Sequence, residues 1–128
     1  MEQVERISFI VPAGFRGAFV VAEDRNAPPV RREGGVSIYE IPLDGLLSTS
    51  SVKPLREWHT ATATFSDATR LPVGGSSPVE PYTDTEVKLR YLYTDSNGRT
   101  YFLIGTESEQ AETLKHRAGL RLGGVPKR

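Results

Sequence analysis

The residues of this chain best suited to acid–base catalysis are one histidine and the carboxylates that could reach it. His59 follows Trp58 in a run that is typical of a β-strand. An imidazole within hydrogen-bond reach of a carboxylate can exchange protons with a substrate, and Asp67 and Asp84 are the candidate partners. Trp58 and Tyr82 would supply an aromatic platform beside them. One hypothesis is therefore a small hydrolase or carbohydrate-active enzyme.

The other hydroxyl and imidazole groups fit structural roles. His116, near the end of a helical pattern, would stabilise the partly negative C-terminus of that helix. Hydroxyl clusters such as residues 48–51 usually satisfy backbone groups in turns, and the Gly-x-Ser-x-Gly sequence that presents a nucleophilic serine is absent. We therefore expect no catalytic residues outside the hypothesis built on His59.

We expect neither a cofactor nor a metal ion. The chain has no cysteine, which excludes disulfides, thiolate-bound zinc, iron–sulfur clusters and thiol nucleophiles. Its two histidines are far apart in sequence, and the stretch that starts at Asp95 lacks the glycine and glutamate that complete a calcium loop. None of the Gly-Gly pairs belongs to a phosphate-binding sequence.

The segment 25–32 is the best candidate for contact with a partner protein. Its Pro-Pro pair favours an extended conformation with exposed carbonyls, and three arginines flank the pair. Unpaired backbone groups at an exposed strand edge could bind a partner strand as well. A stiff connection between two strands is the alternative interpretation of the segment. The residues expected to touch the partner are Arg25, Pro28, Pro29, Arg31 and Arg32.

The charge distribution argues against a nucleic-acid partner. Sixteen lysines and arginines balance sixteen acidic residues, so no global field attracts a polyanion or a membrane surface. Residues 115–128 hold five basic residues and no acid, but no aromatic side chain lies among them to stack on a base. We expect residues 120–128 to form a basic C-terminal tail exposed to solvent.

No membrane span and no signal peptide are expected. Acidic residues precede the apolar run 7–11, where a signal peptide requires positive charge, and Pro12 ends that run. No stretch approaches the ~20 apolar residues that cross a bilayer. These features favour a cytoplasmic location.

The pattern of apolar residues predicts strands separated by turns. Twelve glycines and nine prolines separate short runs rich in β-branched and aromatic residues. Residues 71–82, rich in glycine and proline, form the longest segment without a predicted element and could be a surface loop or a binding loop. The six predicted strands are 4–11, 18–22, 36–41, 58–65, 87–94 and 100–104.

Two local patterns refine this picture. Asn97-Gly98 favours a type I′ turn that joins the last two strands as a hairpin, with Lys88 and Arg90 on its solvent face. Val20-Val21 lie in a run without alternation, which indicates a central strand covered on both faces and hence two layers.

One α-helix is predicted over residues 106–118. Thr106 and Glu109 form a capping box, in which each side chain bonds the backbone amide of the other residue. Leu114 falls on a narrow apolar stripe that would dock the helix on the surface, and Gly119 would end it.

The length of 128 residues predicts one domain, over residues 1–119 including the helix. We expect a mainly β fold, a two-layer antiparallel β-sandwich of the immunoglobulin or transthyretin-like kind with one short C-terminal α-helix.

Several motifs resemble a family of small bacterial domains of unknown function. The resemblance spans nearly the whole chain, except the loop 71–82, and its residues describe turns and strand ends. It implies a fold and an origin without an activity, and some members of the family carry export leaders. The motifs are Val11-Pro12-x-Gly14-Phe15-x-Gly17, Ala27-Pro28-Pro29, Tyr39-x-Ile41-Pro42-x-Asp44-Gly45-x-Leu47-x-Thr49-Ser50 and Phe102-x-Ile104-Gly105-Thr106.

From these observations we expect a non-catalytic module that binds another protein through segment 25–32 and strand edges. The hydrolase hypothesis stays open beside it. If His59 and a carboxylate meet in a concave pocket, the structure favours the enzyme. If His59 lies on a flat face or in the core, the binding module is favoured.

Overall fold

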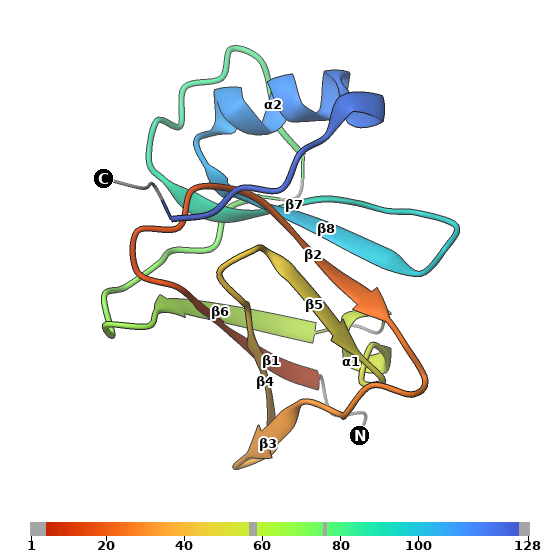
Figure 1. Ribbon diagram of the computed structural model, residues 1–128. Coiled ribbons are helices and arrows are strands. Elements are labelled where there is room, and N and C mark those ends of the chain that lie inside the picture. The colour runs from red at the N-terminus through yellow and green to blue at the C-terminus, as the bar shows by residue number, and fades with distance from the viewer. Residues whose placement is uncertain (1–4, 57–58, 76, 126–128) are drawn as a thin grey trace.

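The strands of this protein form two four-stranded sheets that share one core. The computed structural model describes residues 5–56, 59–75 and 77–125. The first sheet has the order β3-β4-β1-β6 and the second the order β5-β2-β8-β7 (Figure 1). The elements are β1 (Glu5–Val11), β2 (Gly17–Glu23), β3 (Arg31–Glu33), β4 (Val36–Glu40), β5 (Leu46–Thr49), α1 (Lys53–Arg56), β6 (His59–Phe65), β7 (Lys88–Thr94), β8 (Arg99–Gly105), α2 (Glu107–Lys115) and the 3-10 turn η1 (Arg117–Gly119).

All six predicted strands are confirmed, although Val4 and Trp58 lie outside the described residues. The short strands β3 and β5 and the single turn α1 were not predicted. β3 reads Arg-Arg-Glu and β5 ends in Ser-Thr, so neither carries the β-branched pattern that marks a strand. Their partners β4 and β2 hold them in place.

The expectation of an antiparallel fold is wrong for half of the strand pairs. β1 runs parallel to both β4 and β6, and β2 runs parallel to β5. The reason is the path of the chain, which crosses to the other sheet after β1 and again after β4. Parallel neighbours cannot be joined by a tight hairpin, so each of these pairs is connected by chain that leaves the sheet and returns to it. The antiparallel pairs are β3 with β4, β7 with β8 and β2 with β8.

Two similar corners carry the chain from one sheet to the other. Ile10 pairs with Glu40, which places Pro12 beside Pro42 where β1 and β4 end. Pro12 O accepts a hydrogen bond from the amide three residues later, and so does Pro42 O, each at 3.0 Å. Gly14 has φ +82°, a conformation that glycine adopts without strain. The prolines and glycines of the motifs described in the sequence analysis therefore turn the backbone at these two corners.

The core between the sheets is centred on aromatic rings. The ring centroid of Phe9 lies 5.8 Å from that of Phe19 and 5.0 Å from that of Phe102. Val20 and Val21 on β2 are both buried, which confirms the prediction of a strand covered on both faces. Tyr39 is fully buried, and its hydroxyl donates to Ser51 O at 2.6 Å. Burial, reinforced by Glu5, raises the pKa of Tyr39 to about 12.

The β7–β8 hairpin is confirmed, but its turn is not type I′. Gly98 has φ +78°, whereas Asn97 is not in the positive-φ region that a type I′ turn requires of both residues. Instead, Asp95 Oδ1 accepts from the amides of Asn97 and Arg99 at 2.9 and 3.0 Å. The aspartate side chain thus fixes a longer turn that ends in one glycine.

Arg90 was predicted on a solvent face and is buried instead, with 2% of its surface exposed. Its guanidinium donates through Nε to Gly105 O at 2.8 Å and through Nη2 to Glu86 O at 2.9 Å. The described part of the segment between β6 and β7 has no strand or helix, as expected for the loop 71–82. Val73 bridges to Leu89 and Arg90 bonds the end of the segment, so the loop is fastened to β7.

The predicted helix forms as α2, with both hydrogen bonds of the Thr106–Glu109 capping box. Figure 1 shows that α2 covers the side of the second sheet that faces away from the first. Leu114 and Leu120 pack there on Ala18 and Leu103. No helix in the described ranges is long and apolar enough to cross a membrane.

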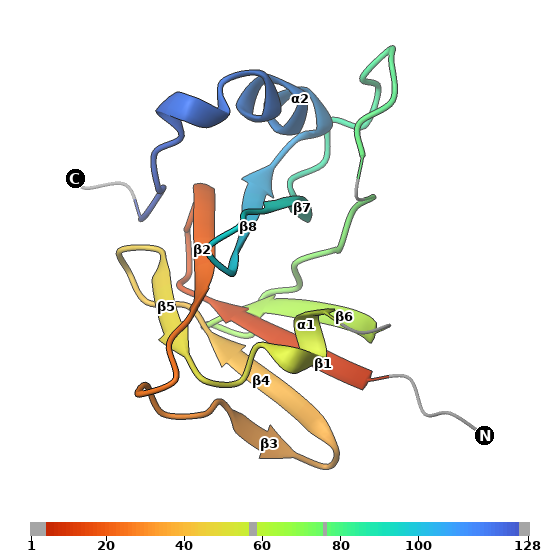
Figure 2. The same ribbon diagram turned by 90° about the vertical axis from the view of Figure 1, so that its right-hand side faces the viewer.

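Residues 120–128 were expected to form a basic tail exposed to solvent. Arg121, Leu122 and Val125 are exposed, but the backbone after η1 is bonded to the start of β2. Gly123 N donates to Ala18 O at 2.7 Å, and Gly124 exchanges two hydrogen bonds with Arg16, each of 3.1 Å. Residues 120–124 therefore lie along β2 as part of the fold, because the backbone there pairs with the start of that strand (Figure 2). Residues 126–128 lie outside the described residues.

Candidate functional site

The structure does not bring His59, Asp67 and Asp84 into one site. His59 begins β6 and lines an apolar cavity of about 230 Å³ between the sheets, and neither aspartate lines that cavity. Asp67 follows the opposite end of β6, where its Oδ1 accepts from the amide of Thr69 at 3.0 Å. Hydrogen bonds from Thr69 lower the pKa of Asp67.

Asp84 belongs to a charged cluster that holds the loop. Its Oδ2 lies 2.7 Å from Lys88 Nζ and 3.1 Å from Arg90 Nη2. Hydrogen bonds from Lys88, from the Glu86 amide and from Arg90 lower the pKa of Asp84 to about 2. Tyr82, the other half of the proposed aromatic platform, donates its hydroxyl to Glu80 Oε1 at 3.0 Å. These contacts fasten the loop and leave Asp84 ionised at neutral pH.

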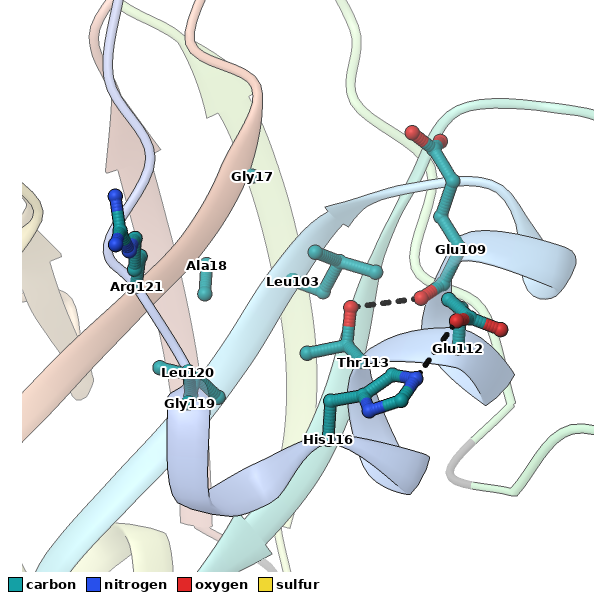
Figure 3. Close-up of a pocket in the computed structure, with 10 residues that line it drawn as sticks. All are labelled: Gly17, Ala18, Leu103, Glu109, Glu112, Thr113, His116, Gly119, Leu120 and Arg121. Carbon is teal, nitrogen blue, oxygen red and sulfur yellow. Dashed lines mark hydrogen bonds and ion pairs between the residues drawn. The ribbon is translucent and has the colours of Figure 1, made fainter.

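A second histidine lies in a hollow of about 370 Å³ between α2 and the second sheet (Figure 3). His116 Nε2 lies 2.9 Å from Glu112 Oε1, one turn earlier on the helix, and both side chains are exposed. Thr113 Oγ1 donates to the backbone oxygen of Glu109 at 2.7 Å. Because the helix uses this hydroxyl, the hollow presents an imidazole–carboxylate pair without a free nucleophile among its lining residues.

The remaining carboxylate of that hollow is also paired. Glu109 Oε1 accepts from Arg16 Nη2 at 2.7 Å and from the amide of Thr106 at 2.8 Å. Partial burial favours a higher pKa for Glu109, but these two contacts outweigh it and the pKa is lowered. Across the described ranges, no three acidic or histidine side chains are arranged to hold a metal ion.

A larger hollow lies on the outer face of the second sheet. It measures about 610 Å³, within the range of sites for small ligands. All four strands of the sheet contribute to its floor, and its wall is formed by Arg117, Ala118, Leu120 and Leu122. Its lining includes Arg99 and Arg117 and no acidic residue. We call this hollow the outer groove.

Two tyrosines and an arginine form a stack in the outer groove. Tyr93 and Tyr101 pair across β7 and β8 with ring centroids 4.7 Å apart and planes at 23°. The Arg117 guanidinium carbon lies 4.6 Å from the centroid of Tyr93, a cation–π contact. The Tyr101 hydroxyl donates to Asp95 Oδ2 at 3.4 Å. Burial raises the pKa of Tyr93 above its usual value.

The strand β5 forms one edge of the second sheet, beside the outer groove. Val20 N donates to Gly45 O at 2.8 Å, and Asp24 N donates to Thr49 O at 3.0 Å. Backbone groups alternate in direction along a strand, so residues 45, 47 and 49 face β2. Residues 46 and 48 must face away from it.

The outward groups of β5 form a free edge. The amide of Leu46 is satisfied by Asp44 Oδ1 at 3.0 Å. The Leu46 carbonyl and both backbone groups of Ser48 have no hydrogen-bond partner among the described residues. The Leu46 side chain is 43% exposed and, like Ser48, lines the outer groove.

The predicted partner segment lies on the other side of this edge. Pro28, Pro29 and Arg31 line a depression of about 160 Å³ together with residues 47–49 of β5. Pro28 O accepts from Thr49 Oγ1 at 2.9 Å. Arg25 is exposed in the turn before the depression and does not line it.

Two of the predicted partner-binding arginines are engaged within the chain. Arg31 forms ion pairs with Glu33 and Glu40 at 3.2 and 3.3 Å. Arg32 donates to Ser37 Oγ at 3.0 Å. The structure thus brings Pro28, Pro29 and Arg31 to the β5 edge and places Arg32 in the sheet beside β4.

Sequence reasoning missed both β5 and the Tyr93–Tyr101–Arg117 stack. The predicted two-residue turn at Asn97-Gly98 would set Tyr93 across from Phe102, so the pairing of Tyr93 with Tyr101 follows from the longer turn that Asp95 fixes. Arg117 had no signal either, since its place depends on how α2 docks.

No protein-family model matches this chain, and no curated protein matches it. Among solved structures, the crystal structure of a "Putative Lipoprotein from Bacillus anthracis" is similar at 12% sequence identity, over 88% of this chain and 78% of that one, with a TM-score of 0.46. A likeness at this level shows neither a family nor an activity.

Proposed function

We propose that this protein is a non-catalytic binding module that takes up an extended segment of a partner protein by strand addition at β5. The observation that carries the proposal is the free edge, where the Leu46 carbonyl and the amide and carbonyl of Ser48 face outward. An extended peptide can pair with such groups whatever its sequence, and its alternate side chains provide specificity.

The hollows on both sides of β5 support this function. Successive side chains of an added strand point to opposite faces of the sheet. One set would lie beside Leu46 and Ser48 at the outer groove, and the other would lie toward Pro28 and Pro29. The β5 edge thus offers backbone partners between two places for side chains.

The other sheet edges are less available. β3 consists of three exposed charged residues, a composition that discourages strand pairing. Residues 69–71 cover the second half of β6 through bonds to Ala63 O and Phe65 N. On β7, Leu89 is bonded to residues 72–74, and Tyr91 O accepts from Gln110 Nε2 at 2.9 Å.

We also propose a type of β-sandwich and a family for this protein. The two sheets packed on one core support a β-sandwich related to the immunoglobulin or transthyretin-like kind. The resemblance to a family of small bacterial domains is supported by the two proline corners, where its motif residues turn the chain.

The test is a peptide titration of the full chain, followed by fluorescence anisotropy. The probe is a labelled, N-acetylated and C-amidated heptapeptide of alternating valine and glutamine. We expect binding to the wild type and to Ser48→Ala, which keeps the amide, and loss of binding with Ser48→Pro, which removes it. Proline is tolerated there because the Ser48 amide makes no bond to β2.

A second probe is tested on the wild-type protein, so its result does not depend on whether the proline variant folds. Methylation of alternate backbone nitrogens of the peptide removes the donors along one of its edges. We expect methylation of one alternate set to abolish binding to the wild type and methylation of the other to preserve it. The proposal is overturned if the unmodified peptide and its two methylated forms bind equally well. It is also overturned if the unmodified peptide does not bind at millimolar concentration.

A further inference from the structure

We infer that the partner segment is acidic, and that Arg99 and Arg117 in the outer groove bind one of its carboxylates. The inference rests on the proposed function, because it concerns the side chains of a strand added at β5. Leu46 and Ser48 line the groove, so the side chains of an added strand that share their face lie beside it.

Unmatched positive charge in the groove favours a carboxylate. Arg99 and Arg117 form no ion pair with any acidic side chain in the described ranges, and the groove has no acidic lining residue. By contrast, Arg31, Arg16, Arg56 and Arg90 all have carboxylate partners. A guanidinium can donate two parallel hydrogen bonds to a carboxylate, which gives both attraction and orientation.

The tyrosine stack holds Arg117 in place before a ligand arrives. The guanidinium rests on the ring of Tyr93, which in turn stacks on Tyr101. Asp95 accepts the hydroxyl of Tyr101 and so fixes the far end of the stack. A side chain that is already ordered loses less entropy when it binds, so this arrangement strengthens recognition of an anion.

The same groups favour a peptide over a single-stranded nucleic acid. Binding of bases generally requires aromatic faces that are free to stack. Tyr93 already contacts both Tyr101 and Arg117 through its ring. The chain also has no net charge to attract a polyanion. An acidic side chain needs only the guanidinium groups.

The test compares the valine–glutamine heptapeptide with a valine–glutamate heptapeptide of the same length. We expect the glutamate peptide to bind about fivefold to tenfold more tightly, because one or two exposed ion pairs increase the affinity by about this factor. The gain should shrink as sodium chloride is raised, because salt screens exposed charges. Equal affinities would overturn this inference and leave strand addition intact, whereas failure of both peptides to bind would remove the proposed function as well.

Substitution of each arginine tests whether Arg99 and Arg117 cause the preference for the glutamate peptide. Arg99→Gln and Arg117→Gln should each reduce the ratio of the affinities for the glutamate and glutamine peptides, and the urea unfolding midpoint of each variant shows that it folds. Arg70→Gln is the matched control, because Arg70 is exposed after β6 and does not line the groove. An undiminished preference in both groove variants would contradict the assignment. Tighter binding of an oligothymidylate that is lost in Arg117→Gln would assign the groove to nucleic acid and overturn the inference.

Discussion

Gly17 and Gly123 meet backbone against backbone, so closely that a Cβ on Gly17 would lie 2.8 Å from the Cα of Gly123. The contact joins the start of β2 to the segment after η1. Next to it, Gly123 N donates to Ala18 O at 2.7 Å. Because Leu120 and Leu122, just before Gly123, form part of the wall of the outer groove, this glycine pair helps to set the shape of the groove.

Gly123→Ala should therefore destabilise the protein. The added methyl group would meet the Arg16 carbonyl and the Cα of Gly17, backbone atoms that cannot turn aside as a side chain would. We expect a loss of about 2 kcal/mol or more in the free energy of unfolding, measured by urea denaturation. The control is Gly119→Ala, where an added Cβ has no heavy atom within 4 Å. Similar unfolding midpoints for the two variants would show that the close approach has no energetic importance.

Asp84 should make stability depend on pH in the acid range. Its pKa in the folded protein, about 2, lies below the ordinary value of 3.8, so its contribution is complete above pH about 4 and is lost as the pH falls toward about 2. Asp84→Asn should lower stability at neutral pH because Lys88 and the buried Arg90 lose their partner. The difference between the two proteins should then shrink between pH about 4 and about 2. A difference that stays constant down to pH about 2 would contradict the role of this carboxylate.

Tyr39 should give the opposite dependence at alkaline pH. Its pKa of about 12 in the folded protein exceeds the ordinary value of 10.0, so its contribution is complete below pH about 10 and is lost as the pH rises toward about 12. Tyr39→Phe removes the ionisable group together with the hydrogen bond to Ser51 O. We expect the variant to be less stable by about 1 kcal/mol at pH 8, with a gap that closes above pH about 10. A parallel decline of both proteins would show that Tyr39 does not titrate in this way.

The elements that could be predicted from the sequence are those with a local physical cause. The capping box of Thr106 and Glu109 and the long strands formed as expected, because neighbouring residues determine them. The hairpin at Asn97-Gly98 was also predicted, although Asp95 shifted its turn type by bonding two amides.

The features that escaped prediction depend on residues far apart in the chain. The parallel pairs of β1 and β2 result from crossings between sheets, which no local pattern records. Arg90 is buried because Gly105 O and Asp84 meet its guanidinium, and both partners reach it only after the loop has folded over β7. The outer groove requires α2 to dock before Arg117 can reach Tyr93. Of the predicted partner segment, Pro28, Pro29 and Arg31 lie at β5. Contact through strand edges was expected, but the edge could not be located because β5 itself was not predicted.

Amide hydrogen exchange at Ser48 tests strand addition most directly. The backbone amide of Ser48 faces outward in the free protein, so it should exchange rapidly and then become protected when the valine–glutamate heptapeptide is added to saturation. The amide of Leu47, which already faces β2, should change little and serves as the internal reference. Protection at Ser48 that follows the binding isotherm is the predicted result. Saturation of the peptide without any slowing of exchange at Ser48 would contradict binding at the β5 edge.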